Sequence, residues 1–505
     1  MKRNTLLATV VLCSIILIPS FVFAAKIPKG EVVYVTGYPI FYNNGGDPAT
    51  HAAGQGPFLA TTIFEGLVDV AVDLTYLPAI AKRWTITPDQ MTHDYYLKEG
   101  IKFHNGDPVT AEDVKFSLET HMRKELKQVL GHSYRKRIKS IEAIDKYHVR
   151  FNLHMPGPGL LKRFWWNGAI MPKNYREKVG DDGFAKAPIG SGPFKWDSYK
   201  QDQWFRITAV KDHHRKAPEI DSFKMIYVVE RSTRLAMLKA GEADIIELAG
   251  PHIPVIKKDP NLRLYQVKDT IGSSIVFIDI GYPEPSPFKD IRVREAMSLA
   301  INRKLICEKI LFGSCSPHGD ILAPLNLGYD PSVKADPYDP EKARALLKEA
   351  GFPKGFSTAY NTTVGGKLVV EALQANWADI GVTVKINIFE GGAWWQATQA
   401  KKLRGMKGRG TWYDVERHPG ADLQDGIIST APWASINLPG VDDLITGSMA
   451  SKNDEEAFEW GRKISKSFRE NRWRAITWSN HHSYGLSKKI VDWEVQRASY
   501  PGTRF

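Results

Sequence analysis

The stretch that most constrains the fold runs from His93 to Leu118 and reads HDYYLKEGIKFHNGDPVTAEDVKFSL. Apolar and polar residues alternate at its start, which predicts a strand. The sequence NGDP at 105–108 predicts a turn, because Asn-Gly favours positive φ and the residue before proline avoids the helical region. Thr110 then predicts a helix N-cap, with Asp113 three residues later. A strand, a turn and a capped helix in succession indicate a compact α/β unit, and none of these residues forms a catalytic motif.

The later part of the chain continues this alternation of strand-like and helix-like patterns. Asp290 is placed to cap one helix, and Asp339 with Pro340 to cap another that ends at Gly351. The glycine- and proline-rich segment 188–194 predicts a hinge between lobes. At 505 residues the chain is too long for one ordinary hydrophobic core. We therefore expect an α/β protein of two or three domains.

Three segments of the chain carry a specific resemblance to a known family. They read LKEGIKFHNGDPVTAEDVKFSL from residue 97, LKAGEADI from residue 238 and PFKDIRVREAMSLAINRKLI from residue 287. Their residue order closely resembles the family 5 extracellular solute-binding proteins, which are the oligopeptide-, dipeptide- and nickel-binding receptors of bacterial ABC importers. The resemblance spans nearly all of the chain that follows the first segment.

The resemblance implies a periplasmic-binding-protein-like fold of two large mixed α/β lobes with a hinge and an extra small domain. It places lobe I in residues 25–67, 190–275 and 476–505. It places the small domain in residues 68–189 and lobe II in residues 276–475. We treat these boundaries as predictions.

The first 24 residues predict a secretory signal peptide. Lys2 and Arg3 precede an apolar run, Leu6 to Val22, and Val22-Phe23-Ala24 matches a small-x-small cleavage site. An uncleaved membrane anchor is the competing interpretation. After Ala25 no run approaches the ~18 apolar residues that span a bilayer. We expect an exported, periplasmic protein cleaved near Ala24.

The formal net charge of +12 and the pI near 9.2 describe a basic chain. Lys and Arg are spread throughout, and no nucleic-acid-binding motif is present, so we do not expect nucleic acid as a partner. Such a charge can steer anions towards the protein. The basic group at 135–139 is expected to form a solvated face.

Two cysteines, Cys307 and Cys315, follow the predicted signal peptide. In an exported protein they could form a disulfide that closes a short loop and stabilises the fold by roughly 2–3 kcal/mol. Cys307 lies in a predicted helix, however, which leaves the bond undecided. A metal site is less favoured, because His318 is the only imidazole nearby. We predict no metal and no cofactor.

A ligand of such a receptor would lie between the lobes. In peptide-binding members of the resembled family, a segment similar to Gly410–Asp414 (GTWYD) carries an aspartate that accepts the α-ammonium of the peptide. The matching residue here is Asp414, beside the aromatic Trp412 and Tyr413. The next residues, VERHP, depart from the family pattern, which leaves an ordinary capping role for Asp414 open.

Other candidate ligand contacts come from three places in the chain. Trp394 and Trp395 could stack on a ligand or fill the core. Arg404 and Arg409 could bind a carboxylate end, although arginines are more often solvated. The loop residues Gly54, Gln55 and Gly56 border the cleft in the resembled family. His418 is a weak candidate for a nickel ligand.

We therefore predict a receptor that captures a short peptide and delivers it to the permease of an ABC importer, and that acts as a monomer. An oligosaccharide, an opine-like conjugate or a nickel chelate are the alternative ligands. The rival class, an exported hydrolase, lacks a G-x-S-x-G or H-E-x-x-H motif. The adjacent pairs His213–His214 and His481–His482 are expected to point to different sides of a strand.

Overall fold

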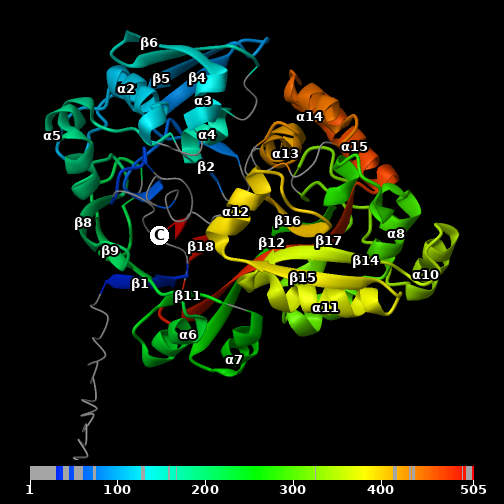
Figure 1. The fold of residues 1–505 in the computed structure, drawn as a ribbon. Coiled ribbons are helices and arrows are strands. Elements are labelled where there is room, and N and C mark those ends of the chain that lie inside the picture. The colour runs from blue at the N-terminus through cyan, green and yellow to red at the C-terminus, as the bar shows by residue number, and fades with distance from the viewer. Residues whose placement is uncertain are drawn as a thin grey trace, which may run out of the picture.

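A computed structural model of the chain has one continuous eleven-stranded sheet at its centre (Figure 1). The structure describes residues 30–37, 45–50, 58, 61–71, 75–126, 131–156, 160–166, 168–215, 217–248, 250–324, 326–412, 418–431, 434, 438–491, 493–495 and 503–504. The strand order in the large sheet is β15-β14-β16-β12-β17-β11-β1-β10-β9-β8, and β13 pairs with β17. These strands are β1 (Glu31–Thr36), β8 (Phe194–Lys200), β9 (Trp204–Ala209), β10 (Ser222–Tyr227), β11 (Ile245–Glu247), β12 (Leu262–Phe277), β13 (Cys315–Pro317), β14 (Ser357–Thr363), β15 (Thr383–Phe389), β16 (Met406–Trp412) and β17 (Arg474–Ser487).

Two long antiparallel strands, β12 and β17, are neighbours in the middle of this sheet. Residues 262–267 of β12 pair with residues 482–487 of β17, and residues 271–276 pair with residues 474–480. The register breaks between Val267 and Ile271, where Asp269 has φ 56°. We call the part of the sheet with β1 and β8–β11 the first lobe, and the part with β13–β16 the second lobe. The chain thus passes between the lobes within two paired strands.

A separate four-stranded sheet, in the order β4-β5-β7-β6, forms the small domain. Its strands are β4 (Ala81–Ile86), β5 (Thr92–Leu97), β6 (Ile138–Asp145) and β7 (His148–Leu153). In Figure 1 a gap between ribbons separates it from three helices of the second lobe, α13 (Pro419–Ile427), α14 (Val441–Met449) and α15 (Asp454–Asn471). The remaining strands pair in twos: β2 (Val68–Val70) with β3 (Tyr76–Pro78), and β18 (Glu494–Val495) with β19 (Thr503–Arg504).

Helices cover the sheets. The α-helices are α2 (Ala111–His121), α3 (Gly131–Arg137), α4 (Leu160–Trp166), α5 (Lys173–Lys186), α6 (Arg231–Ala240), α7 (Ile253–Lys258), α8 (Ile291–Leu299), α9 (Arg303–Leu305), α10 (Pro340–Glu349), α11 (Lys367–Ala378), α12 (Gly391–Gln399), α13 (Pro419–Ile427), α14 (Val441–Met449) and α15 (Asp454–Asn471). Short 3₁₀ turns are η1 (Lys124–Leu126), η2 (Gly250–His252), η3 (Ile278–Gly281), η4 (Pro287–Lys289) and η6 (Val364–Gly366), and η5 (Ile306–Ile310) is a π-helix.

The second lobe is layered because side chains alternate along its strands. Ile275 and Phe277 of β12 belong to a core that includes residues of α8, α10 and α11. The intervening Val276 belongs to a second core with residues of α13, α14 and α15. Figure 1 shows α11 on one side of the sheet and α13–α15 on the other.

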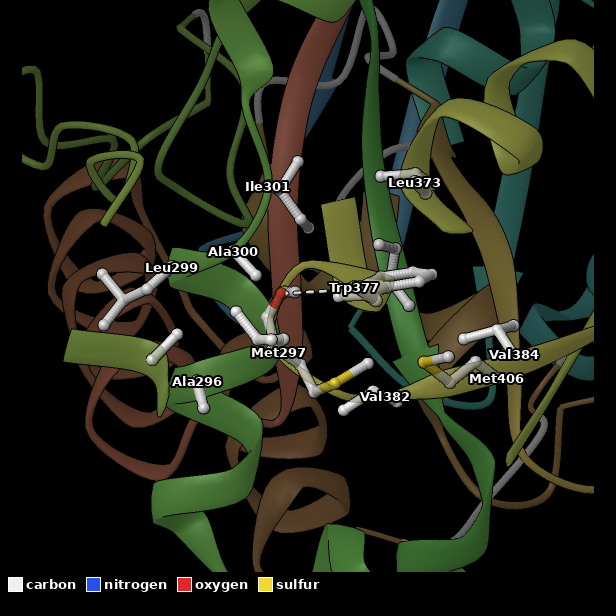
Figure 2. Close-up of a cluster of buried hydrophobic side chains, with 14 of the residues drawn as sticks. Ala296, Met297, Leu299, Ala300, Ile301, Leu373, Trp377, Val382, Val384 and Met406 are labelled. Atoms are coloured by element: carbon white, nitrogen blue, oxygen red, sulfur yellow. Dashed lines mark hydrogen bonds between the residues drawn. The ribbon is translucent and has the colours of Figure 1, made fainter. Parts of the chain in front are cut away.

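Trp377 of α11 lies at the centre of the first of these cores (Figure 2). Its side chain is fully buried, and its indole Nε1 donates a hydrogen bond of 2.9 Å to the Met297 carbonyl at the end of α8. The ring therefore packs α11 against α8 and satisfies its own polar atom.

The helix boundaries follow the predicted capping residues. Thr110 and Asp113 form a capping box at the start of α2. The Asp290 carboxylate accepts from the Arg292 amide at the start of α8, and Asp339 accepts from the Lys342 amide at the start of α10. These predictions are confirmed, because each is a short-range interaction between a side chain and nearby backbone donors.

Cys307 and Cys315 form a disulfide, with their Cα atoms 5.3 Å apart. Cys307 lies in η5 and Cys315 in β13, so the bond joins a helical turn to the edge of the large sheet. The two cysteines bond to each other, and the Nε2 of His318 lies 3.0 Å from the Leu322 carbonyl oxygen. The sequence left this bond undecided, and the structure contains the disulfide.

The hinge expected at 188–194 lies at the junction between the small domain and the first lobe, and its role as a hinge stays a prediction. This segment leads from the small domain to β8, but Gly190 and Gly192 pack against backbone. A Cβ at Gly190 would lie 2.1 Å from the Ile63 carbonyl oxygen, and one at Gly192 would lie 2.4 Å from that of Thr62. These glycines permit close approach, and the passage between the lobes lies in β12 and β17.

Candidate functional site

The small domain and the second lobe contact each other directly. The Gln90 side-chain amide donates to the carbonyls of Ser451 and Lys452, at 3.3 and 2.9 Å. The Arg137 guanidinium donates to the Gln424 side chain at 3.3 Å. Arg137 is buried, so the expectation of a solvated face is wrong for this residue of the basic group. Both contacts join parts of the molecule that the sheet itself does not connect.

A cavity of about 400 Å³ lies between the small domain and the second lobe. Its volume falls in the range of pockets that hold small solutes. It is lined from the small-domain side by Tyr76, Ile86, Thr87, Pro88, Gln90, His93 and Leu161, and from the other side by Leu327, His418, Ser451, Lys452, Asn453 and Asp454.

Two buried histidines line this cavity from opposite sides. His93 is 1% exposed and His418 is 7% exposed, and neither Nε2 atom has a hydrogen-bond partner among the described residues. The Nδ1 of His418 accepts from the Ala421 amide at 3.3 Å, so its Nε2 carries the proton when the ring is neutral. Burial lowers the pKa of each imidazole to about 4, and for His418 the Arg137 charge adds to this effect. Near pH 7 both rings are neutral hydrogen-bonding groups.

These pKa values predict a loss of stability in acid. In the unfolded chain each histidine regains a pKa near 6.5, so below this pH the unfolded state binds more protons. We expect the free energy of unfolding to fall between pH 6.5 and 4 by up to about 3 kcal/mol per buried histidine. Urea titrations across this range should show a smaller fall for His93→Gln than for the unchanged protein. The control His154→Gln, at an exposed position, should leave the pH dependence unchanged; an identical fall in all three proteins would contradict the assignment.

The structure places some of the predicted ligand residues along β16 and α12. Trp394 of α12 is half-buried, with its ring 6.0 Å from that of Phe389, and the Lys407 ammonium lies 5.7 Å from the Trp394 ring. Trp395 is also in α12, but its side chain lies outside the described residues. Trp412 ends β16 opposite Ile271, next to the register break of β12. The structure thus brings Trp394 towards β16.

The two predicted arginines lie in different surroundings. Arg404 is exposed at the far end of β16 from Trp412, with its guanidinium 3.5 Å from the centre of the Tyr282 ring. Arg409 lies within β16 and packs against α13, where a Cβ on Gly426 would come 2.4 Å from its Nη2. The structure therefore does not bring Arg404 and Trp412 together.

The remaining predicted contacts are not described. Tyr413 and Asp414, the side chain of Trp412, and the loop residues Gly54, Gln55 and Gly56 lie outside the described residues. Their roles stay predictions.

Another polar cluster surrounds the buried Glu65 carboxylate in the first lobe. His214 Nε2 lies 2.8 Å from Glu65 Oε2, His213 Nε2 lies 3.7 Å from it, and Arg215 donates to Oε1 at 2.7 Å. Burial alone would raise the pKa of Glu65, but hydrogen bonds from His213 and His214 and the Arg215 charge hold it well below its usual range. The expectation that His213 and His214 point to different sides is wrong, because the Nε2 atoms of both rings lie close to the same Glu65 oxygen. Although the three groups could approach a metal ion, Arg215 already neutralises the carboxylate.

The sequence contained no signal that Gln90, His93 and Ser451 lie where the small domain meets the second lobe. Gln90 and Ser451 are separated by 361 positions, and each is an ordinary polar residue in its local pattern. Among the described residues, no helix combines the length and apolar character needed to cross a bilayer.

The chain is similar in sequence to known solute-binding proteins. Residues 75–416 match the profile of the bacterial extracellular solute-binding proteins, family 5. Di/tripeptide-binding protein 2 of Pseudomonas aeruginosa is 31% identical over 389 residues, which cover 70% of this chain and 72% of that protein. Di/tripeptide-binding protein 1 of the same organism is 28% identical over 431 residues, or 78% of each chain.

A solved structure shows the same fold. It is a periplasmic binding protein associated with an ABC transporter of Helicobacter pylori, in complex with the peptide STSA. The similarity has a TM-score of 0.76 at 24% identity and covers 93% of this chain and 96% of that one. The predicted fold, two α/β lobes of the periplasmic-binding-protein type, is confirmed.

Proposed function

Because the chain belongs to the bacterial extracellular solute-binding proteins of family 5, we propose that it captures a short peptide between its lobes. It then presents the peptide to the membrane permease of an ABC importer. The observation that carries this proposal is that β12 and β17 join the two lobes, while the small domain meets the second lobe by side-chain contacts around a cavity. Such an arrangement suits a receptor that closes on its ligand.

The family consists of solute-binding receptors, so the chain is a binding protein and not an enzyme. Its ligand is held by contacts with both sides of the molecule when the lobes are shut. Because those contacts are absent in the open state, ligand binding shifts the population towards the closed state. No bond of the ligand has to be made or broken in this cycle.

The proposed ligand contacts are those inferred from the sequence. Asp414 would accept the α-ammonium of the peptide, and the aromatic groups Trp394, Trp395, Trp412 and Tyr413 would cover its side chains. Arg409 is better placed than Arg404 for a carboxylate end, since it lies in β16 on the way to Trp412. The loop Gly54–Gly56 would pair with the peptide backbone.

The names of the relatives support a di- or tripeptide as the ligand of this chain. An oligosaccharide, an opine-like conjugate and a nickel chelate are the alternatives. Small-angle scattering of the protein with a defined peptide mixture should show a saturable decrease in the radius of gyration. If the radius of gyration falls with one of the other solutes but not with peptides, that solute and not a peptide is the ligand.

Asp414 gives a sharper prediction. Asp414→Asn should weaken the binding of free-amino dipeptides at least about tenfold, because a charge-assisted hydrogen bond is lost. Binding of N-acetylated dipeptides, which lack the ammonium, should change little. Isothermal titration of both ligand series measures the difference. Asp443→Asn, an exposed aspartate of α14, is the matched control and should affect neither series; equal losses for both series would remove Asp414 from the site.

Members of this family are periplasmic. We propose that this chain reaches the same compartment after cleavage near Ala24 and acts there as a monomer. The signal peptide, residues 1–24, lies outside the described residues, and the lobe boundaries inferred from the resemblance also stay predictions.

A further inference from the structure

A second, smaller cavity lies within the second lobe, away from the small domain. Its volume is about 110 Å³, enough for a small ion and too little for a peptide. It lies where β17 begins, between this strand and α15. It is lined by Gly319, Ile321, Val333, Lys334, Asp336, Ser465, Phe468, Arg469, Arg472, Arg474 and Ile476.

Arg474, the first residue of β17, lines this cavity. It is 7% exposed, and its Nε and Nη1 atoms are buried and have no hydrogen-bond partner among the described residues. Ile476 lines the same cavity two positions later, as expected if both side chains point from one face of the strand. A buried guanidinium always carries a charge, and burying it without a counter-charge is costly.

The other charged groups at the cavity do not neutralise Arg474. Of the described residues that line it, only Asp336 is acidic, and Arg472 Nη1 contacts both of its carboxylate oxygens, at 2.7 and 2.6 Å. The Ser298 hydroxyl also donates to this carboxylate, at 2.5 Å. Two further cations, Lys334 and Arg469, are exposed at the cavity. The walls thus hold four cationic side chains and one acid that is already paired.

Positive charge also lies on the adjoining part of the sheet. Lys407 of β16 pairs in register with Val276, which pairs with Arg474, so the two cations lie on one face with β12 between them. Lys407 is 1% exposed, and burial together with Arg409 and Arg474 lowers its pKa to about 7. Burial, and then the charge of Arg409, lowers the pKa of Arg474 to about 9. This face therefore favours a bound anion.

We propose that the cavity beside Arg474 binds a small oxyanion of the sulfate or phosphate type. The guanidinium offers several N–H donors in a planar fork, which matches two oxygens of such an ion. Lys334 and Arg469 line the same cavity from exposed positions and add positive charge that attracts the ion. Water could satisfy the donors of Arg474 but could not offset its charge. The site lies apart from the cavity between the small domain and the second lobe, so it can be tested independently of solute binding.

Thermal unfolding with added oxyanion tests the proposal. Sodium sulfate or phosphate at about 100 times Kd should raise Tm saturably by about 2–4 °C over sodium chloride at equal ionic strength. Arg474→Met should abolish this rise. Without oxyanion, the Tm of Arg474→Met should equal or exceed that of the unchanged protein, because an unpaired buried charge has been removed. Arg231→Met, at an exposed arginine in α6, is the matched control and should keep the full rise.

Two further measurements locate the ion. Crystals grown with selenate should show an anomalous peak beside the Arg474 guanidinium, at about 3–4 Å from its nitrogen atoms. If Arg474→Met does not fold, Arg474→Lys keeps the charge without the fork and should weaken sulfate binding at least about tenfold in calorimetry. A rise in Tm that chloride reproduces, an equal rise in Arg474→Met, or a selenate peak elsewhere would each overturn the proposal.

Discussion

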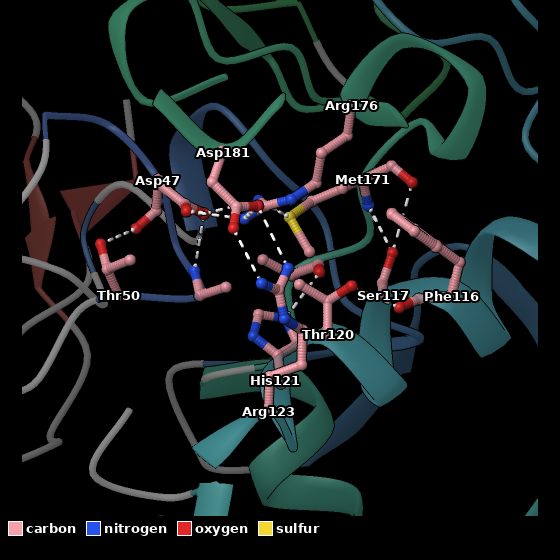
Figure 3. A network of polar contacts seen from close by, with 12 residues as sticks. Asp47, Thr50, Phe116, Ser117, Thr120, His121, Arg123, Met171, Arg176 and Asp181 are labelled. Atoms are coloured by element: carbon pink, nitrogen blue, oxygen red, sulfur yellow. Dashed lines mark hydrogen bonds and ion pairs between the residues drawn. The ribbon is translucent and has the colours of Figure 1, made fainter. Parts of the chain in front are cut away.

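Replacement of Asp47 with alanine is expected to lower the free energy of unfolding by about 3–5 kcal/mol, because it leaves the Arg176 guanidinium buried without its main counter-charge. Asp47 and Arg176 are 1% and 2% exposed, and two hydrogen bonds of 2.7 and 2.8 Å join them (Figure 3). The pair joins the segment 45–50 to α5. Arg176 also donates to Asp181 at 2.8 Å and lies 4.7 Å from the centre of the Phe184 ring.

Urea unfolding followed by circular dichroism measures this change. Asp47→Ala combined with Arg176→Met should recover much of the loss, since the double variant buries no charge at this position. Asp212→Ala, which removes an exposed aspartate from the same lobe, is the matched control and should stay within about 0.5 kcal/mol of the unchanged protein. A loss in Asp47→Ala no larger than in this control would show that Asp181 alone suffices for Arg176.

The second large effect is expected at Trp377, at the centre of the core between α8, α11 and the sheet. Trp377→Ala removes a fully buried ring and should cost about 3–5 kcal/mol, because the surrounding side chains cannot close the space completely. Trp377→Phe keeps most of the volume but leaves the Met297 carbonyl without its donor, and should cost about 1–3 kcal/mol.

These two costs should appear in the unfolding of the second lobe, measured by urea titration with circular dichroism. Leu368→Ala is the control on the same helix, because Leu368 is 54% exposed and contributes little packing. If Trp377→Ala and Leu368→Ala unfold at the same urea concentration, the indole is not a main contact of this core.

Short-range features of the fold were predictable from the sequence. Thr110, Asp290 and Asp339 each cap a helix through atoms within three residues, so their local pattern is sufficient evidence. The two-lobed fold was predicted from the family resemblance and not from local patterns. The ligand-binding segment was assigned only by matching its residue order to that of the family. The role of Asp414 still rests on that match.

The sequence could not predict what depends on distant partners. The contact of Gln90 with Ser451 and the shared cavity of His93 and His418 arise only when the small domain meets the second lobe. Arg474 reads as an ordinary strand residue until its neighbours are known. The glycines of 188–194 have a role that composition does not show, because Gly190 and Gly192 let two backbone segments approach closely.

The pairing of β11 with β17 has a consequence for the order in which the molecule can be completed. β11 lies between β1 and β17, and its residues Ile245 and Ile246 pair with Leu486 and Gly485. During synthesis, β11 lacks its partner β17 until residues 474–487 have been made, long after β11 itself. A newly made chain therefore carries an open sheet edge at β11 until β17 emerges. Because β17 also pairs with β12 in the second lobe, the two lobes become complete together.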